Sequence, residues 1–335
     1  MKKAERTFVF FGLIGLCFFL FHSIDLAEAK DPAYPTKPIN FYIGMGAGGL
    51  HDLSCRVIAN AASKHLGQPF AFINKAGAGG SLAAMAVITA KPDGYALGGI
   101  STSAIVAPFF DESPYKDLSG LTMIANFGQF INPVVVRTDA PWKTWKELVE
   151  YARKNPNAVK IGITSAKVVS NPGFLMWQVE KKENIEFAYV PFKSGAEIVS
   201  ALLGGHIAIS CASVDASLMS WVKEGKLRLL AFMETGKMPG YENLPSLQDM
   251  YGLVNPNVSG VWGPKGLPDY VVKKLDDAFA KAIKDPDFIG VMNQLQSPIL
   301  YMNSAQMTKH IDDLFPKVGE KYKLLKAEEK AKEKK

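Results

Sequence analysis

Two glycine-rich stretches contain the residues of this 335-residue chain that are best suited to chemistry. The first reads Gly44-Met45-Gly46-Ala47-Gly48-Gly49-Leu50-His51-Asp52, and the second reads Asn74-Lys75-Ala76-Gly77-Ala78-Gly79-Gly80-Ser81. Each follows a strand-like run and precedes a helix-like run. Glycine lets the main chain approach a ligand closely, and N–H groups at the start of a helix attract negatively charged oxygen. The pair therefore predicts a cradle for an anion such as a carboxylate.

Polar residues at other strand ends are expected to complete this site, because open α/β sheets bind ligands outside the carboxyl ends of their strands. Ser101 and Thr102 follow a strand-like run, although capping of the next helix fits them equally well. His51 is expected to line the first stretch, and Asp52 is first of all a helix N-cap. Corresponding strand ends occur in the second half of the chain. The predicted ligand-binding residues are Gly46, Ala47, Gly48, Gly49, Leu50, His51, Asp52, Gly77, Ala78, Gly79, Gly80, Ser101, Thr102, Ser165, Ser170, Phe192, Ser194 and Asp215.

Other chemistries are poorly supported by the sequence. Gly44, Gly46 and Gly49 satisfy the dinucleotide fingerprint G-x-G-x-x-G, but Ile73-Asn74-Lys75 stands where the ribose-binding acid is required. His51 and Cys55 are one helical turn apart and could start a metal site, yet no partner cluster is visible. The motifs G-x-S-x-G and H-E-x-x-H do not occur. We therefore expect no catalytic residue, no metal and no cofactor.

Strand and helix signals alternate along the chain, which predicts mainly parallel sheets with helices on their faces. The number of units favours two sheets, with the chain crossing between them near Ala125–Asn132 and Tyr251–Val261. Residues 30–126 and 256–335 are expected to form lobe one, and residues 127–255 to form lobe two. Strands are predicted at Ile39–Ile43, Pro69–Ile73, Tyr95–Ile100, Asn132–Val136, Val159–Ile163, Phe187–Val190, Ile207–Ser210 and Arg228–Phe232.

The N-terminus has the three parts of a cleaved secretory signal. Lys2, Lys3 and Arg6 precede the apolar run Phe8–Phe21, and Ala27-Glu28-Ala29 provides a small-residue cleavage site. The apolar run is shorter than the roughly 20 residues that a membrane-spanning helix needs, although an uncleaved anchor is the alternative. We expect residues 1–29 to be removed and the mature protein to reside in the periplasm.

Charge and cysteine content narrow the class of partner. The formal net charge is +6, but much of it comes from Lys321–Lys335, which we interpret as a solvated, fraying helix end with membrane-surface contact as a lesser possibility. A positive charge concentrated in a tail argues against nucleic-acid binding. Two cysteines, Cys55 and Cys211, remain after signal removal. They could form one disulfide, but they fall in different lobes, so two free buried thiols are favoured.

Several motifs together resemble one family. Tyr34-Pro35-Thr36-Lys37-Pro38-Ile39 resembles Y-P-x-[KR]-P-I, and Ala47-Gly48-Gly49 with Asp52 and Arg56 matches A-G-G-x-x-D-x-x-x-R. Further matches are Asn74 with Gly77-Ala78-Gly79-Gly80, Pro92-Asp93-Gly94-Tyr95, Val190-Pro191-Phe192-Lys193-Ser194-Gly195, Leu203-Gly204-Gly205, and Gly225-Lys226-Leu227-Arg228-Leu229-Leu230-Ala231. In this order, over essentially the whole mature chain, the sequence resembles the Bug family of solute receptors of tripartite tricarboxylate transporters.

The resemblance implies a type II periplasmic-binding-protein fold of the α/β class, with two doubly wound lobes and a hinged ligand cleft. It also implies a small organic carboxylate as ligand, aliphatic or aromatic, and a two-subunit membrane permease as partner. A monomer is expected. Gly44 stands where the family often has Pro, and Ile73 where an acid is usual, which leaves the identity of the carboxylate open. The alternatives are an exported receptor that senses or scavenges without a permease, and an exported enzyme acting on a carboxylate.

Overall fold

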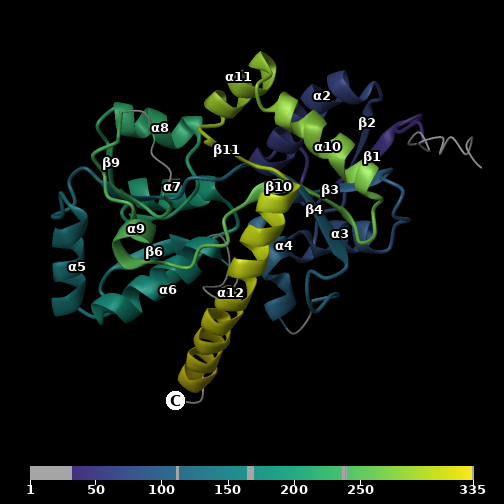
Figure 1. The fold of residues 1–335 in the computed structure, drawn as a ribbon. Helices are drawn as coiled ribbons and strands as arrows, with labels where there is room; N and C mark the ends of the chain where they lie inside the picture. Colours follow the sequence, from purple (N-terminus) through teal and green to yellow (C-terminus); the bar gives the residue numbers. More distant parts are fainter. Residues whose placement is uncertain (1–31, 111–112, 164–169, 236–237, 239, 334–335) are drawn as a thin grey trace, which may run out of the picture. The chain divides into compact units, whose positions relative to one another are not determined.

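The computed structural model describes residues 32–110, 113–163, 170–235, 238 and 240–333. The chain divides into a short first unit, Met1–Tyr34, and a second unit, Pro35–Lys335. All helices and strands named below lie in the second unit (Figure 1). Within the described ranges, no helix is both long enough and apolar enough to cross a membrane.

The strands of the second unit form two sheets. In the first sheet, β1 is parallel to β2 and to β3, whereas β10 is antiparallel to β3 and β4. Parallel neighbours need a crossover between them, and helices α2 and α3 provide it. Across the described part of this sheet the order is β11 (Ile299–Met302), β4 (Leu121–Gly128), β10 (Ser259–Pro264), β3 (Ala96–Ile100), β1 (Ile39–Ile43) and β2 (Phe70–Asn74).

The second sheet repeats this order with its own strands. Here β6 is parallel to β7 and β8, and β5 is antiparallel to β8 and β9. Within the described residues the order is β7 (Ala188–Pro191), β6 (Lys160–Ile163), β8 (Ile209–Ser210), β5 (Pro133–Arg137) and β9 (Leu227–Phe232). In both sheets an antiparallel strand therefore follows three parallel ones. Because parallel strands end at the same edge, the loops after β1, β2 and β3 share one edge, as do those after β6, β7 and β8.

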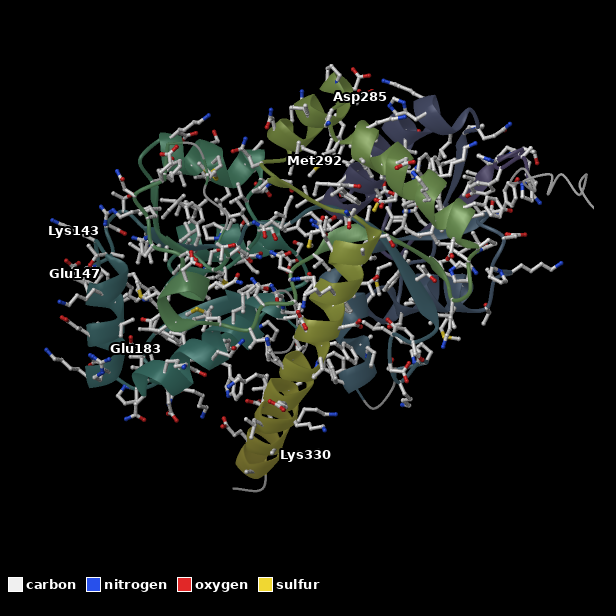
Figure 2. The ribbon with its side chains drawn as sticks, viewed as in Figure 1. Lys143, Glu147, Glu183, Asp285, Met292 and Lys330 are labelled. Atoms are coloured by element: carbon white, nitrogen blue, oxygen red, sulfur yellow. The ribbon has the colours of Figure 1, made fainter. Side chains whose placement is uncertain are left out.

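Several of the helices that connect the strands begin at a side-chain cap. In α5, Thr144 caps the helix by accepting from the N–H of Glu147, and the Glu147 carboxylate accepts from the N–H of Lys143. Figure 2 labels Lys143 and Glu147 beside this helix. The described helices are α2 (Leu50–Leu66), α3 (Ser81–Ile88), α4 (Thr102–Val106), α5 (Trp145–Lys154), α6 (Asn171–Glu183), α7 (Gly195–Leu203), α8 (Ala216–Lys223), α9 (Leu247–Tyr251), α10 (Asp269–Ala282), α11 (Pro286–Gln294) and α12 (Ser304–Glu333), with 3-10 turns η1 (Ala78–Gly80) and η2 (Ala107–Phe109).

The sequence failed to predict the strands beside the two crossings. The chain passes from the first sheet to the second between β4 and β5, and it returns before β10. Both β4 and β10 overlap the segments that we expected to be connections, because their Gly, Asn and Pro residues resemble a loop. They form strands because they pair with each other, and that pairing buries Trp262 and Phe127. Pairing over more than 120 positions of sequence leaves no local signal.

The C-terminal segment is the end of a helix, as expected, but its apolar residues are buried rather than solvated. It continues α12, in which Tyr322 and Leu325 are fully buried. The Tyr322 ring stacks on Phe174 with centroids 4.2 Å apart, and Lys326 Nζ donates to the carbonyl oxygen of Phe109 at 3.1 Å. The expectation overlooked that these apolar residues recur at helical spacing within a lysine-rich run. Cys55 and Cys211 are free and buried, as predicted.

Candidate functional site

The two glycine-rich turns lie side by side at one edge of the first sheet. The first turn, residues 44–49, joins β1 to α2, and the second turn, residues 75–80, joins β2 to α3. Ile43 and Asn74 are partners in the parallel pair, and Lys75 N–H donates to the carbonyl oxygen of Ile43 at 2.8 Å. The register of two neighbouring strands therefore places the turns together.

The main chains of the two turns touch. A Cβ atom added to Gly44 would lie 2.6 Å from the Cα of Gly80, so only a residue without a side chain fits there. A Cβ on Gly80 would lie 3.2 Å from Ser101 Oγ, at the end of β3. The three strand ends that the sequence analysis singled out in the first sheet are thus brought together. Gly44, which departs from the family pattern, is the point of closest approach.

The second turn presents main-chain donors without acceptors. Gly77, Ala78, Gly79 and Gly80 have φ angles of 135°, 45°, 64° and 94°, a run of left-handed or related conformations. Gly80 N–H donates to the carbonyl oxygen of Gly77 at 2.9 Å. The N–H groups of Gly77, Ala78 and Gly79 have no acceptor among the described residues, and these three residues are exposed. Such a turn is suited to an anion.

The first turn opens onto an uncapped helix. Gly49 is the N-cap of α2 and has no side chain that could accept from the first N–H groups of the helix. The corresponding residue of α3 is Gly80, and it provides no side-chain cap either. Helix N-termini carry partial positive charge, and their first N–H groups need acceptors from outside the helix. Both turns therefore offer donors that a carboxylate could satisfy.

Asp52 does not act as the N-cap that we predicted, because the helix begins two residues earlier and places Asp52 in its first turn. Its carboxylate is buried, and Gly48 N–H donates to Oδ2 at 2.9 Å. Arg56 Nε also donates to Oδ2 at 2.9 Å, and Asn74 Nδ2 donates to Oδ1 at 2.8 Å. Burial acts to raise the pKa of Asp52, but these hydrogen bonds outweigh it and the pKa is lowered. Asp52 is therefore ionised and fully engaged in positioning the turns.

Arg56 and Asn74 complete this network, although neither was among the predicted site residues. Asn74 Nδ2 also donates to the carbonyl oxygen of Met45 at 3.0 Å, and Arg56 Nη2 donates to Asn74 Oδ1 at 2.8 Å. The network thus links both turns through side chains. The i,i+4 spacing of Asp52 and Arg56 on a helix was the signal that could have identified an ion pair.

His51 faces the interior rather than the open side of the first turn. Its Nε2 lies 3.6 Å from Cys55 Sγ, and its ring meets Phe130 edge-on with centroids 6.3 Å apart. Burial lowers the pKa of His51 to about 4, so the ring is neutral at pH 7. No group of three or more His, Cys, Asp or Glu that could hold a metal ion is present among the described residues. The His51 side chain therefore adds no charge to the site, although its main-chain N–H lies at the open helix start.

The predicted residues of the second sheet are mostly helix caps. Ser165 lies outside the described residues, whereas Phe192 follows β7 and is half-buried. The remaining predicted residues are Ser170, Ser194 and Asp215. Each accepts from the main-chain N–H of the third residue in the helix that follows it, as Ser101 does at α4. The bonds run from Gly173 N–H to Ser170 Oγ at 3.3 Å, from Glu197 N–H to Ser194 Oγ at 3.2 Å, and from Leu218 N–H to Asp215 Oδ1 at 2.8 Å. The helix starts are thus capped by side chains at this edge and open at the two glycine-rich turns.

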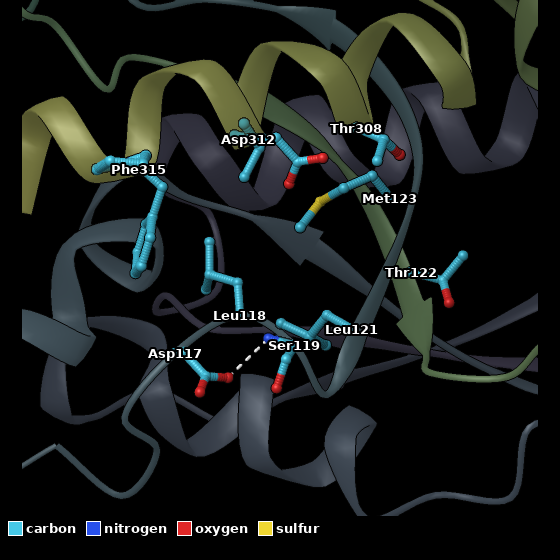
Figure 3. A pocket seen from close by; sticks show the side chains of 11 residues that line it. Asp117, Leu118, Ser119, Leu121, Thr122, Met123, Thr308, Asp312 and Phe315 are labelled. Atoms are coloured by element: carbon cyan, nitrogen blue, oxygen red, sulfur yellow. Dashed lines mark hydrogen bonds between the residues drawn. The ribbon is translucent and has the colours of Figure 1, made fainter.

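A hollow of about 520 Å³ beside α12 contains none of the predicted residues. Figure 3 shows Asp117 and Asp312 on its wall, with Ser119 N–H donating to Asp117 at 2.8 Å. Its remaining lining is largely apolar, including Leu118 and Phe315. Two carboxylates make this hollow unfavourable for an anion.

Comparison with known proteins identifies similar chains. The family model described as tripartite tricarboxylate transporter family receptor matches residues 54–326. A Cupriavidus necator protein, the UPF0065 protein in the gbd 5' region, is 33% identical over 306 residues, covering 90% of this chain and 92% of that protein. BugT of Bordetella pertussis is 25% identical, covering 88% of this chain and 83% of its own length.

Solved structures agree on the fold. A TctC solute-binding protein from Polaromonas, solved without ligand, superposes with a TM-score of 0.76 at 26% identity, covering 86% of this chain and 98% of that one. The periplasmic binding protein BugD gives a TM-score of 0.69 at 25% identity, covering 87% and 98%. The two sheets are therefore those of a two-lobed periplasmic binding protein, as the sequence predicted.

Proposed function

We propose, since the chain belongs to the tripartite tricarboxylate transporter receptor family, that its two glycine-rich turns hold a carboxylate group of its solute. The chain is a solute receptor that binds a small organic carboxylate for a transporter of this class. Its family consists of substrate-binding receptors rather than enzymes. The observation that carries the proposal is the set of open N–H groups at Gly77, Ala78 and Gly79, next to the uncapped start of α2.

The donors of the two turns account for a large part of the affinity that a transport receptor needs. A hydrogen bond to a charged oxygen contributes about 1.5–3 kcal/mol. A few such bonds approach the roughly −8 kcal/mol of a micromolar complex, and contacts to the rest of the solute would offset the cost of ordering it. The Asp52 network already fixes the main chain of the first turn through Gly48 and Met45, so little ordering of that turn is needed.

The second sheet would contact the rest of the solute. Ser165, Ser170, Phe192, Ser194 and Asp215 follow strands of that sheet, and a hydroxyl that accepts a cap bond can still donate its own proton. We propose that residues 30–126 and 256–335 move as one lobe and residues 127–255 as the other. A solute that touches both lobes only when they are closed would shift the population toward the closed form.

Export and delivery complete the proposal. Residues 1–29 would direct the chain to the periplasm and be cleaved, and the mature monomer would deliver its solute to a permease of one large and one small subunit. The positively charged start, the short apolar run and the small-residue site support export. Family membership supports the permease as partner.

A thermal-shift panel tests the proposed binding. Two Rhodopseudomonas palustris proteins of this fold, 20% and 21% identical to this chain, were solved with malate and with adipate. The panel therefore contains malate, adipate and benzoate together with their neutral amides. At least one acid is expected to raise the melting temperature, since a ligand at 100 times its Kd adds about 2.7 kcal/mol, and no amide should do so. Equal shifts with acids and amides would contradict a site built for negative charge.

A further inference from the structure

A buried carboxylate joins the two segments that connect the sheets. These connecting segments are residues 129–132 and 252–258, and Glu234 follows β9 of the second sheet. Glu234 Oε2 accepts from Asn132 N–H at 2.8 Å, and Oε1 accepts from Asn132 Nδ2 at 2.6 Å. Asn257 Nδ2 donates to the same Oε1 at 3.2 Å. One side chain, fully buried, therefore holds a residue of each connecting segment.

The two connecting segments are also bonded directly through Asn257. Its side-chain Oδ1 accepts from Phe130 N–H at 3.3 Å, and its Nδ2 donates to the carbonyl oxygen of Phe130. Asn132 and Asn257 are both buried. Glu234 and the two asparagines form a closed network in which every described partner of the carboxylate is a neutral donor.

This network reaches both edges where the proposed solute site lies. On the side of the second sheet, Ser213 Oγ donates to Asn132 Oδ1 at 2.8 Å, and Val214 N–H donates to the carbonyl oxygen of Ile131 at 2.9 Å. These bonds fix the loop 211–215, which ends at the cap of α8. On the side of the first sheet, the Phe130 ring packs against His51 at the start of α2.

We propose that Glu234 is a positioning residue of the receptor, whose carboxyl group fixes the two connecting segments and thereby orients the loop 211–215 toward the solute. The inference rests on the proposed function for its role in solute binding. The hydrogen bonds on which it depends do not involve the glycine-rich turns. Among the described residues, burial and these neutral donors are what act on the charge of Glu234.

Protonation is therefore linked to the order of this network. Burial raises the pKa of Glu234 from 4.5 to about 7, against the lowering effect of the bonds from Asn132 and Asn257. The titratable group that faces it from the loop after β8 is the Cys211 thiol. Burial and the nearby Glu234 raise the pKa of Cys211, so the thiol stays neutral. Because opening the network would return the pKa of Glu234 toward its ordinary value, the intact network is favoured at low pH. That preference is lost as pH rises from 4.5 through about 7.

Hydrogen exchange on the mature chain without ligand tests the positioning role. Glu234→Gln is expected to speed exchange at Val214 and Asn132 about tenfold. The side-chain NH2 group of the new glutamine would face N–H donors of Asn132 or Asn257 that now bond a carboxylate oxygen. The matched control is Glu180→Gln, another buried glutamate, which lies on α6 and accepts from Phe187 N–H at 2.8 Å. That variant should affect Phe187 and leave Val214 unchanged. Equal exchange at Val214 in wild type and Glu234→Gln would overturn the inference.

The pH profile separates a titrating positioning residue from a passive one. In wild type, exchange at Val214, corrected for its intrinsic rate, should become faster between pH 5 and pH 8, and in Glu234→Gln this change should vanish. A flat wild-type profile would overturn the link between protonation and the order of the network, even if the variant did not fold.

Calorimetry with malate and adipate then tests the link to solute binding. For whichever acid wild type binds, Glu234→Gln should weaken affinity about tenfold and Glu180→Gln should not. Unchanged affinity together with faster exchange would show that Glu234 has no role in solute binding. Failure of wild type to bind any acid of the thermal-shift panel would contradict the proposed function instead, and the exchange result would stand on its own.

Discussion

At the scale of single residues, the chemistry of the site comes from backbone conformation rather than from charged side chains. The run of positive φ angles from Gly77 to Gly80 turns N–H groups outward, and Ala78, at φ 45°, is the one residue of the run with a Cβ atom. Main-chain donors are fixed by the fold and lose little entropy when an anion binds. Anion selectivity is therefore expected to survive substitutions that change the solvated lysines of the surface.

A pair of substitutions at Gly79 tests this directly. Gly79 has φ 64° and ψ 24°, a left-handed conformation that Asn and Asp adopt more readily than other side chains. Gly79→Asp places a carboxylate beside the open N–H groups and should weaken carboxylate binding about tenfold or more. The new carboxylate would occupy these N–H groups and repel the carboxylate of the solute. Gly79→Asn has the same shape without the charge. Both variants should have similar melting temperatures, and calorimetry giving them the same Kd would show that the anion binds elsewhere.

The Asp52 network gives a second prediction at this scale. Asp52→Asn removes the charge that accepts from Gly48, Arg56 and Asn74, and should cost about 1.5–3 kcal/mol of unfolding free energy at pH 7. The folded-state pKa of Asp52 is lowered, so its stabilisation is present above its ordinary value of 3.8 and is lost as pH falls below it. Denaturant unfolding at pH 7 and pH 3 measures both effects.

The control for this experiment is Asp117→Asn. Asp117 is exposed and also accepts from a main-chain N–H, that of Ser119. Its substitution should change the unfolding free energy little. If Asp52→Asn cost no more than Asp117→Asn, or if its cost were the same at pH 3 as at pH 7, Asp52 would not be the ionised anchor described here.

At the scale of elements, α12 contributes through a buried aromatic residue. Tyr322 stacks on Phe174 of α6 and lies near Phe109 of η2, with ring centroids 5.8 Å apart. Trp177 Nε1 donates to Glu328 of α12 at 3.0 Å. The Tyr322 hydroxyl is buried and has no hydrogen-bond partner among the described residues. Tyr322 is thus held by ring packing rather than by a described hydrogen bond.

Two substitutions of Tyr322 separate packing from hydrogen bonding. Tyr322→Phe removes an unsatisfied hydroxyl and should leave stability unchanged or raise it by about 1 kcal/mol. Tyr322→Ala creates a cavity in the same place and should cost about 3–5 kcal/mol. Thermal and denaturant unfolding measure both. A large loss in Tyr322→Phe would mean that the hydroxyl has a partner and that the packing account of α12 is incomplete.

The sequence predicted elements well where the signal is local. The strand at Ile39–Ile43 was predicted with its observed bounds, and both glycine-rich turns were identified as turns between strand and helix. The strand β11 was missed along with β4 and β10, because all three depend on neighbours far along the chain. The predicted helix start at Asp52 was two residues late, because Gly49 provides no polar side chain to indicate an N-cap.

At the scale of the whole molecule, the order of strands brings separate sequence segments together at the candidate site. Residues 44–49, 75–80 and 101–102 follow three adjacent parallel strands, so the sheet places at one edge what the sequence separates by more than 50 positions. The sequence could predict this meeting because parallel strands end together. It could not predict the Glu234 network, whose members lie on two connecting segments and one strand end, and which leaves no spacing pattern.

The two-lobed fold follows from the same order, whereas the receptor class follows from the family match. The lobe boundaries are a prediction. Substitutions in either glycine-rich turn should therefore affect solute binding, whereas substitutions in the hollow beside α12 should not. The Glu234 network adds that solute binding should also respond to the segments between the sheets.

The most direct measurement is a crystal structure of the mature chain with the acid that gives the largest thermal shift. The account predicts one carboxylate with oxygens within about 2.7–3.2 Å of N–H groups from both turns, including at least one of Gly77, Ala78 and Gly79. A solute bound with both turns free of its oxygens, or held by side-chain cations elsewhere, would contradict it.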